Sequence, residues 1–161
     1  MIIRELNSNI ELGTSVLVIR GSFVTVAEEF NLTKENCPTH PSFVSIDNLK
    51  DLVAKGVSLF GLFNGEIQIG FVALEKGNND VYYLEKLAVL PAFRRQGYGR
   101  QLVDFIVGKV LAKRGKKISI GIIDESKKLK AWYRDNGFRE IGTKTFPHLP
   151  FTVCFMERIV D

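Results

Sequence analysis

The stretch from Leu84 to Gly99 (LEKLAVLPAFRRQGYG) constrains the fold of this chain more than any other segment. An apolar run typical of a strand leads through a short turn into a glycine-rich loop, and the loop opens an amphipathic helix. The first N–H groups of a helix have no partner within it, and the helix dipole places positive charge at the same end. A strand, a glycine loop and a helix in this order therefore predict an anion-binding site.

The composition of the loop narrows the kind of anion site. Gly97 and Gly99 allow a tight turn and a close approach of the backbone to a ligand. Arg94 and Arg95 stand just ahead of them, where their side chains can reach phosphate oxygens. No Gly-Lys-Ser/Thr sequence follows, so this is not a Walker A loop, and the third glycine of the dinucleotide-binding fingerprint is missing.

Length and charge bound the class of protein. The 161 residues, 45% of them hydrophobic, are enough for a single domain spanning residues 1–161 with its own core. Eight of the basic residues lie between Arg94 and Lys117, with Asp104 as the only acid there, while the whole chain is only +4. This distribution favours a polyanionic ligand at the loop, with a solvated helix face as the alternative. Nucleic acid is disfavoured because no aromatic residues alternate with the basic ones.

No apolar run reaches the roughly 18 to 20 residues that span a bilayer, and the N-terminus lacks the basic start and apolar core of a signal peptide. We therefore expect a cytoplasmic protein without a membrane partner. Cys37 and Cys154 are too few for a disulfide framework. The Cys37-x-x-His40 pair has no further histidine except His148, so we expect no metal.

Periodicity and turn residues predict an alternating α/β order. Gly21 is predicted to break or kink the first helix, Asp47 to cap the second, and Asn64-Gly65 to close a hairpin. The predicted strands are residues 1–6, 57–63, 66–76, 81–90, 117–123, 138–146 and 151–159, and the predicted helices are 11–30, 47–55, 98–114 and 127–135. A helix between strands 81–90 and 117–123 makes that pair parallel.

Two motifs carry a resemblance to a known family. The pattern Arg94-x-x-Gly97-x-Gly99 after LAVLP (87–91), together with the later AWYRDNGF (131–138), resembles the GCN5-related N-acetyltransferases (GNAT) over nearly the whole chain. The resemblance implies the α/β GNAT (acyl-CoA N-acyltransferase) fold, a mixed central sheet of about seven strands with four helices. In that fold the fourth and fifth strands splay apart and admit the pantetheine arm of acetyl-CoA.

The resemblance also implies which residues hold acetyl-CoA as co-substrate. Backbone groups in the segment Leu87, Ala88 and Val89 pair with the pantetheine amides, and the N–H of Leu87 polarises the thioester carbonyl. Arg94 and Arg100 supply counter-charge to the pyrophosphate. Ser126 stands where the family often has an Asn that contacts pantetheine. The residues whose N–H groups cradle the pyrophosphate are Arg95, Gln96, Gly97, Tyr98 and Gly99.

Two residues are candidates for proton transfer. Glu85 is the only carboxylate in strand 81–90, and strict alternation places it on one face with Leu87 and Val89. Apolar neighbours would raise its pKa and suit it to act as a general base. The alternatives are an ion-paired strand residue, or a bulge that shifts the alternation. Tyr133 matches the family tyrosine that protonates the departing thiolate, with an aromatic core residue as the alternative.

The acceptor is less constrained. By resemblance, segments 31–45 and 146–151 wall its pocket, and their Phe, Pro and His residues form either an apolar slot or loop packing. We expect an acetyl-CoA-dependent N-acetyltransferase that acts on a primary amine of a small molecule, by direct attack in a ternary complex. The alternatives are a protein N-terminus or lysine as acceptor, a non-catalytic acyl-CoA-binding module, and a basic interaction domain. Homodimers are common in the family.

Overall fold

A computed structural model describes all residues from 1 to 161 and contains one mixed sheet of seven strands in the order β1-β2-β3-β4-β5-β7-β6. The strands are β1 (Ile2–Glu5), β2 (Ser58–Asn64), β3 (Ile67–Lys76), β4 (Val81–Val89), β5 (Lys117–Ile123), β6 (Arg139–Lys144) and β7 (Val153–Ile159). The helices are α1 (Asn9–Glu29), α2 (Ile46–Ala54), α3 (Tyr98–Ala112) and α4 (Lys127–Asp135), with 3₁₀ turns η1 (Pro41–Phe43) and η2 (Pro91–Phe93). The predicted strands, helices and fold class are confirmed, with shifts at the ends.

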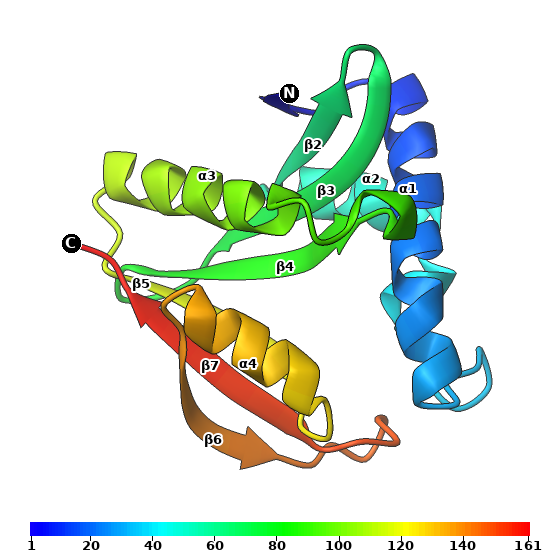
Figure 1. The fold of residues 1–161 in the computed structure, drawn as a ribbon, viewed down its shortest axis with the longest axis vertical. Helices are drawn as coiled ribbons and strands as arrows, with labels where there is room; N and C mark the ends of the chain where they lie inside the picture. Colours follow the sequence, from blue (N-terminus) through cyan, green and yellow to red (C-terminus); the bar gives the residue numbers. More distant parts are fainter.

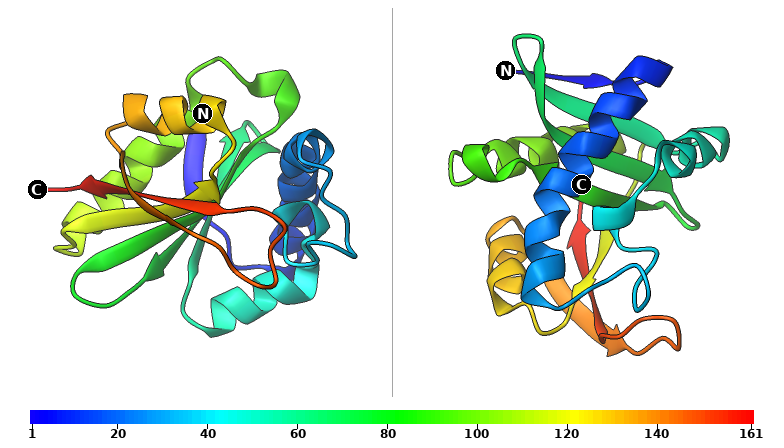
Figure 2. Two further views of the ribbon diagram at one scale, coloured as in Figure 1. Left: turned by 90° about the horizontal axis from the view of Figure 1, so that it is seen from below. Right: turned by 90° about the vertical axis from the view of Figure 1, so that its right-hand side faces the viewer.

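The helices cover both faces of the sheet. Helices α3 and α4 lie on one face, and α1 and α2 lie on the other (Figures 1 and 2). Each face has its own apolar cluster: the larger, with 19 buried residues, includes Leu102, Ile106 and Tyr133. The smaller, with 13, includes Ile19, Leu49 and Phe71. The sheet therefore separates two chemically distinct sides of the molecule.

Strands β4 and β5 separate soon after they begin. They pair in parallel only from Val81 to Tyr83 against Lys117 to Ser119, and then diverge toward α1 (Figure 1). Strand β5 stays paired with β7 over its whole length. The predicted splaying of the fourth and fifth strands is therefore present, and the second half of β4 has no strand neighbour on that side.

Helix α1 is continuous, so the predicted break at Gly21 is wrong. A Cβ built on Gly21 would lie 3.2 Å from a side-chain carbon of Leu90, just after β4. The glycine therefore serves a close approach of α1 to the sheet. Helix α1 is long and apolar enough by composition to cross a membrane, yet one of its faces is buried against the strands. A core helix passes the same test, so this is weak evidence for a membrane segment.

Two local predictions also differ from the structure. Helix α2 is capped by Ser45 rather than by Asp47. The Ser45 hydroxyl accepts from the Asn48 N–H, and the Ser45 N–H donates to the Asn48 side-chain oxygen. This reciprocal box satisfies two backbone donors at once. The β2–β3 hairpin turns at Gly65 and Glu66, and only Gly65 has positive φ, because Asn64 pairs with Ile67 and still belongs to the strand.

Candidate functional site

The loop between β4 and α3 is shaped by two left-handed residues. Arg95 (φ 62°) and Gly97 (φ 84°) turn the chain sharply before α3 begins at Tyr98. Gln101 is the first residue of this helix whose N–H meets a backbone carbonyl, that of Gly97. The six N–H groups from Arg95 to Arg100 donate to no protein atom. Together with the dipole of a 15-residue helix, these free N–H groups are suited to bind an anion, as the sequence leads us to expect.

The two glycines of the loop have different tasks. No atom lies within 4 Å of a Cβ built on Gly97, so the space beside it is open to a ligand. A Cβ on Gly99 would lie 2.9 Å from the Trp132 ring of α4. Gly97 therefore keeps the anion site open, whereas Gly99 lets α3 approach α4.

Arg94 does not face the anion site. Its guanidinium donates to the Val89 carbonyl (3.2 Å), to the Thr25 hydroxyl (3.2 Å), and to the Ser22 carbonyl (2.7 Å) and hydroxyl (3.3 Å). These bonds tie the loop to α1 and to the end of β4. The prediction that Arg94 is a counter-charge is therefore corrected, and Arg94 is a positioning residue. Arg95 and Arg100 remain exposed and without an ion-pair partner.

A bulge in β4 decides which side chains share a face. Phe71 of β3 pairs with Ala88 of β4, and Ala73 pairs with Glu85, so β4 has one more residue than β3 between these two pairs. Within this extra stretch, Lys86 takes a positive φ of 52°. Beyond the bulge, Leu87 and Val89 pack against the α3/α4-side cluster, and Ala88 joins the other one. Glu85 lies opposite Ala73, whose side chain is on the α1/α2 side. The prediction that Glu85 shares a face with Leu87 and Val89 is therefore wrong, because the bulge reverses the alternation.

The end of β4 keeps few backbone groups free. The Val89 carbonyl accepts from both Ser22 and Arg94, so its two lone pairs are engaged. The N–H of Leu90 pairs with Ile69 of β3, so alternation turns the backbone of Val89 away from β3 and toward the split. Of the groups predicted to pair with pantetheine, the N–H of Val89 is therefore better placed than its carbonyl.

Tyr133 lies on the α3/α4 side, where Leu87 and Val89 also point. It is 5% exposed and packs edge-on against Trp132 and Phe138, with ring centroids 4.9 and 5.3 Å away. Burial raises the pKa of its phenol well above the usual value, which keeps the group protonated. The hydroxyl has no protein partner and is not fully enclosed, since no enclosed polar side-chain atom lacks a hydrogen bond. It is a proton donor that remains available.

The carboxyl of Glu85 has an unusually high pKa. Burial, with a hydrogen bond to Glu75 on the neighbouring strand, raises its pKa to about 7, while Lys86 and Lys55 oppose the shift. A group that gains and loses a proton near neutral pH suits general base catalysis. The geometry thus supports the predicted chemistry of Glu85 but places it on the α1/α2 face of the sheet.

The two segments predicted to wall the acceptor pocket, residues 31–45 and 146–151, pack against different parts of the protein. His40 contacts Phe23 and Phe43 edge-on, and its Nδ1 lies 2.7 Å from the Ser42 hydroxyl. Burial lowers the pKa of His40 to about 4, so it is neutral at physiological pH. Segment 146–151 reaches the end of α1 in a small separate cluster. That cluster contains Ala27, Leu32, Cys37 and Ile123, with Leu149 and Phe151 packed against it.

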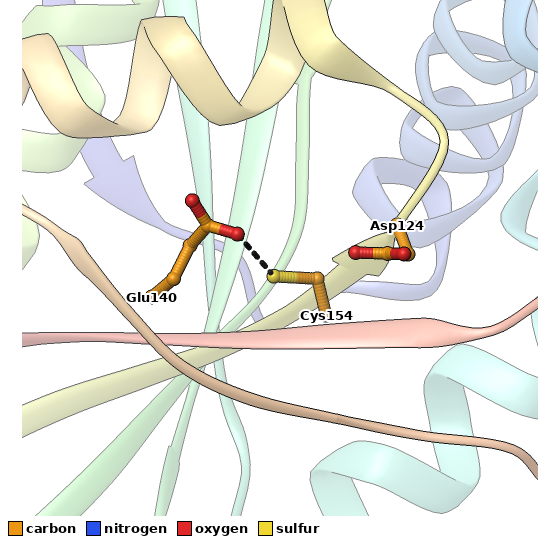
Figure 3. A group of neighbouring side chains, drawn as sticks. All are labelled: Asp124, Glu140 and Cys154. Carbon is orange, nitrogen blue, oxygen red and sulfur yellow. Dashed lines mark hydrogen bonds between the residues drawn. The ribbon is translucent and has the colours of Figure 1, made fainter.

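Three potential metal ligands, Asp124, Glu140 and Cys154, come within 4.8 Å of one another beside α4 (Figure 3). Lys130 forms ion pairs with both Asp124 and Glu140, and Glu140 accepts a hydrogen bond from the Cys154 thiol at 3.5 Å. Arg134 also pairs with Glu140, so two positive charges already balance the two carboxylates. Nearby, Ser126 caps α4 by accepting from the Leu129 N–H, so its oxygen is partly engaged before any ligand contact.

The sequence reasoning missed two lysines and a serine. Lys55 and Lys86 line a cavity on the α1/α2 side, and Ser22 joins Arg94 in tying α1 to the loop. Lys86 lines the cavity because it lies at the bulge of β4, and the apolar pattern of the strand does not reveal where the bulge is. The roles predicted for Gln96, Tyr98 and Arg100 stay predictions.

Comparisons with known proteins agree with this geometry. A family model for the acetyltransferase (GNAT) domain matches residues 56–140, more than half of the chain. No curated protein matches the sequence significantly. Solved structures match over nearly the whole chain at low identity. They include a paiA N-acetyltransferase from Thermoplasma acidophilum in complex with coenzyme A (TM-score 0.79, 19% identity, 99% of each chain).

Two further structures show the same fold. The ribosomal-protein-S18-alanine N-acetyltransferase from Escherichia coli has a TM-score of 0.77 at 15% identity, covering 99% of this chain and 94% of its own. An aminoglycoside 6′-N-acetyltransferase complexed with coenzyme A has a TM-score of 0.75 at 16% identity, covering 100% and 98%. At these identities the likeness concerns the fold, and the acceptors of these proteins differ from one another.

Proposed function

Because this chain belongs to the GNAT acetyltransferase family, we propose that it moves the acetyl group of acetyl-CoA to a primary amine of a small molecule, by direct attack in a ternary complex. The observation that carries the proposal is the run of six unpartnered N–H groups, from Arg95 to Arg100, next to the split between β4 and β5. Two structural relatives are complexes with coenzyme A.

The residues present fit acetyl-CoA in three respects. The open N–H groups and the helix dipole suit a pyrophosphate, and Arg95 and Arg100 stand beside them as counter-charges. The unpaired side of β4 suits an extended arm with amides. The apolar side chains of Leu87 and Val89 suit its methylenes. Only the Val89 carbonyl is poorly available, since Ser22 and Arg94 already bond to it.

The chemistry then divides between the two faces of the sheet. Glu85 takes a proton from the acceptor ammonium, directly or through water, and the free amine attacks the thioester carbon. The backbone N–H of Leu87 stabilises the charge that develops on the carbonyl oxygen. When the C–S bond breaks, Tyr133 gives its proton to the sulfur, and the second proton of the attacking nitrogen replaces it. The net reaction releases one proton per turnover.

No covalent acetyl-cysteine is part of this scheme. Cys37 and Cys154 are both buried, and burial raises the pKa of each thiol. Cys154 points into the cluster with Glu140, and Cys37 packs under the end of α1. We also propose that the protein works in the cytoplasm, and that a homodimer, if it forms, is not required for the site, since every group named above comes from one chain.

The test is release of free CoA thiol from acetyl-CoA in the presence of a panel of primary amines, with wild type and Tyr133→Phe. We expect turnover on at least one small amine and a drop in kcat of roughly 10- to 100-fold in the variant, with unchanged acetyl-CoA affinity. Trp132→Phe is the matched control, because it alters the neighbouring aromatic residue without removing a proton donor. An unchanged kcat in Tyr133→Phe would remove the general-acid role.

Turnover on peptides but on no small amine would favour a protein acceptor instead. Tight binding of acetyl-CoA without turnover on any amine would favour a non-catalytic acyl-CoA-binding module.

A further inference from the structure

We propose that the acceptor amine carries an anionic group, a carboxylate or a phosphate, which Lys55 and Lys86 bind in a cavity on the α1/α2 side of the sheet. This inference rests on the proposed function and names the class of its second substrate. It comes from the shape and charges of that cavity rather than from the family, whose structural relatives act on chemically different acceptors.

The cavity has a volume of about 440 Å³ and lies between segment 38–44, helix α2 and the bulge of β4. Its polar lining comes from Thr39, His40, Asn48, Asp51, Lys55 and Lys86. A volume of this size is typical of small-molecule sites, which use a few placed polar groups for orientation. The cavity therefore suits a small acceptor rather than a protein segment lying across the surface.

The bulge brings Lys86 and Glu85 together. Lys86 has a positive φ, so it departs from strand alternation and lines the cavity while Glu85 stays on the same α1/α2 side. Glu85 directly precedes Lys86 in the chain, and Lys86 and Lys55 come together at the cavity, which Glu85 itself does not line. An acceptor held by the two lysines therefore lies on the same side of the sheet as Glu85, toward which its nitrogen can extend.

Neither lysine has a partner in the protein. None of the ion pairs in the structure involves Lys55 or Lys86, although Lys86 is half-buried. Of the other titratable groups that face the cavity, His40 is neutral and Asp51 is a single acid. The cavity thus offers two free cations and one anion, and Glu85 lies on the same side of the sheet, directly before Lys86. This arrangement is complementary to a molecule with an ammonium at one end and an anion at the other.

The same charges disfavour other acceptors. A polyamine or an aminoglycoside would bring several ammonium groups toward two lysines, and such like-charge contacts reject a competing substrate. A neutral amine would leave both lysines without a partner. Carboxylate and phosphate share the chemistry that a lysine ammonium recognises, so the experiment must separate them.

The test compares matched amines in the thiol-release assay. The panel pairs 4-aminobutyrate with butylamine, O-phosphoethanolamine with ethanolamine, and adds putrescine as a polycation. We expect kcat/KM for the preferred anionic amine to exceed that of its neutral partner by at least tenfold. The carboxylate and phosphate arms show which anion the site prefers.

Variants then locate the recognition. Lys55→Gln and Lys86→Gln are each expected to raise the acceptor KM by roughly fivefold or more, with the KM for acetyl-CoA unchanged. Lys50→Gln is the control, because Lys50 is an exposed lysine of the same helix, α2, that does not line the cavity. Lys86→Glu should shift preference toward putrescine.

The outcomes separate this inference from the proposed function. Turnover that favours butylamine, ethanolamine or putrescine in the wild type would overturn the anionic acceptor and leave acetyl transfer standing. Equal effects of Lys50→Gln and Lys86→Gln would also overturn it. No thiol release with any amine, despite acetyl-CoA binding, would overturn the proposed function itself.

Discussion

The two sides of β4 differ in how they are built. On the α3 side, the anion site is made of backbone: six N–H groups from one continuous loop and the start of one helix. On the α1/α2 side, the cavity is made mainly of side chains, which come from residues 38–55 and from Lys86 on another part of the fold, the bulge of β4. A site made of contiguous backbone leaves a readable motif, because only certain residues allow its geometry. A site made of scattered side chains leaves no such motif.

Substitution of Gly97 is expected to have the largest effect on the backbone anion site. Gly97 has a φ of 84°, and a Cβ there meets no protein atom within 4 Å, so a bulky side chain would compete with a ligand for the open space beside the loop. We expect Gly97→Trp to weaken acetyl-CoA binding by at least about 100-fold, measured by calorimetric titration. Gly97→Ala is the matched control, since it bears the same left-handed strain of about 1–2 kcal/mol but adds only a methyl group. Comparable losses in both variants would mean that backbone conformation, and not obstruction, accounts for the effect.

The α1/α2 side is tested by the pH dependence of the rate. A base must be deprotonated to act, so kcat/KM should rise with pH through the pKa of Glu85, which is about 7, and then level off. We expect Glu85→Gln to lower kcat roughly 10- to 100-fold and to abolish this inflection. Glu75→Gln should keep most of the rate but move the inflection to lower pH, because it removes the neighbouring carboxylate that raises the pKa. Loss of acetyl-CoA affinity in Glu85→Gln would assign Glu85 to structure instead.

Two neighbouring arginines, Arg94 and Arg95, are expected to differ in role, one in stability and the other in ligand binding. Arg94 makes four hydrogen bonds to α1 and β4, whereas Arg95 makes none to the protein. We expect Arg94→Ala to destabilise the fold by about 2 kcal/mol. For a chain of this size that lowers Tm by roughly 4–8 °C. Arg95→Gln should leave Tm unchanged and weaken acetyl-CoA binding in a salt-dependent way. The reverse assignment would contradict the positioning role of Arg94.

The smallest effect concerns His40 and acid. Burial lowers the pKa of His40 to about 4 in the folded protein, below its usual value of 6.5. The unfolded chain therefore binds the proton more readily, and stability falls as the pH drops from about 6.5 toward 4. We expect a loss of about 1 kcal/mol at pH 5.5 relative to pH 7, measured by urea denaturation. His40→Asn keeps an acceptor for the Ser42 N–H and should lack this part of the pH dependence.

Features of the fold that depend on local sequence could be predicted, whereas features that depend on tertiary contacts could not. The order of strands and helices follows from local periodicity, and the anion site follows from Gly97 and Gly99. Tertiary contacts decided the rest. Gly21 continues α1 because Leu90 packs against it, and Arg94 turns to α1 because Ser22 and Thr25 offer it partners.

The site on the α1/α2 side was harder to predict for a specific reason. One extra residue in β4 reverses every side chain beyond it, and nothing in the sequence EKLAV marks which residue bulges. The sequence therefore predicts the wrong face for Glu85, and its role as a general base stays a prediction. Lys55 and Lys86 could not be paired from the sequence, because only the packing of α2 against the sheet brings them together.

The most direct test of the central claim observes the backbone amides themselves. In a ¹H–¹⁵N spectrum titrated with CoA, we predict downfield proton shifts for the amides of Arg95 to Arg100, since these N–H groups gain acceptors from the pyrophosphate. Dephosphocoenzyme A, which lacks only the 3′-phosphate, should produce the same shifts. Unchanged amides in this run, with CoA binding and shifting signals elsewhere, would contradict the assignment of the loop as the pyrophosphate site.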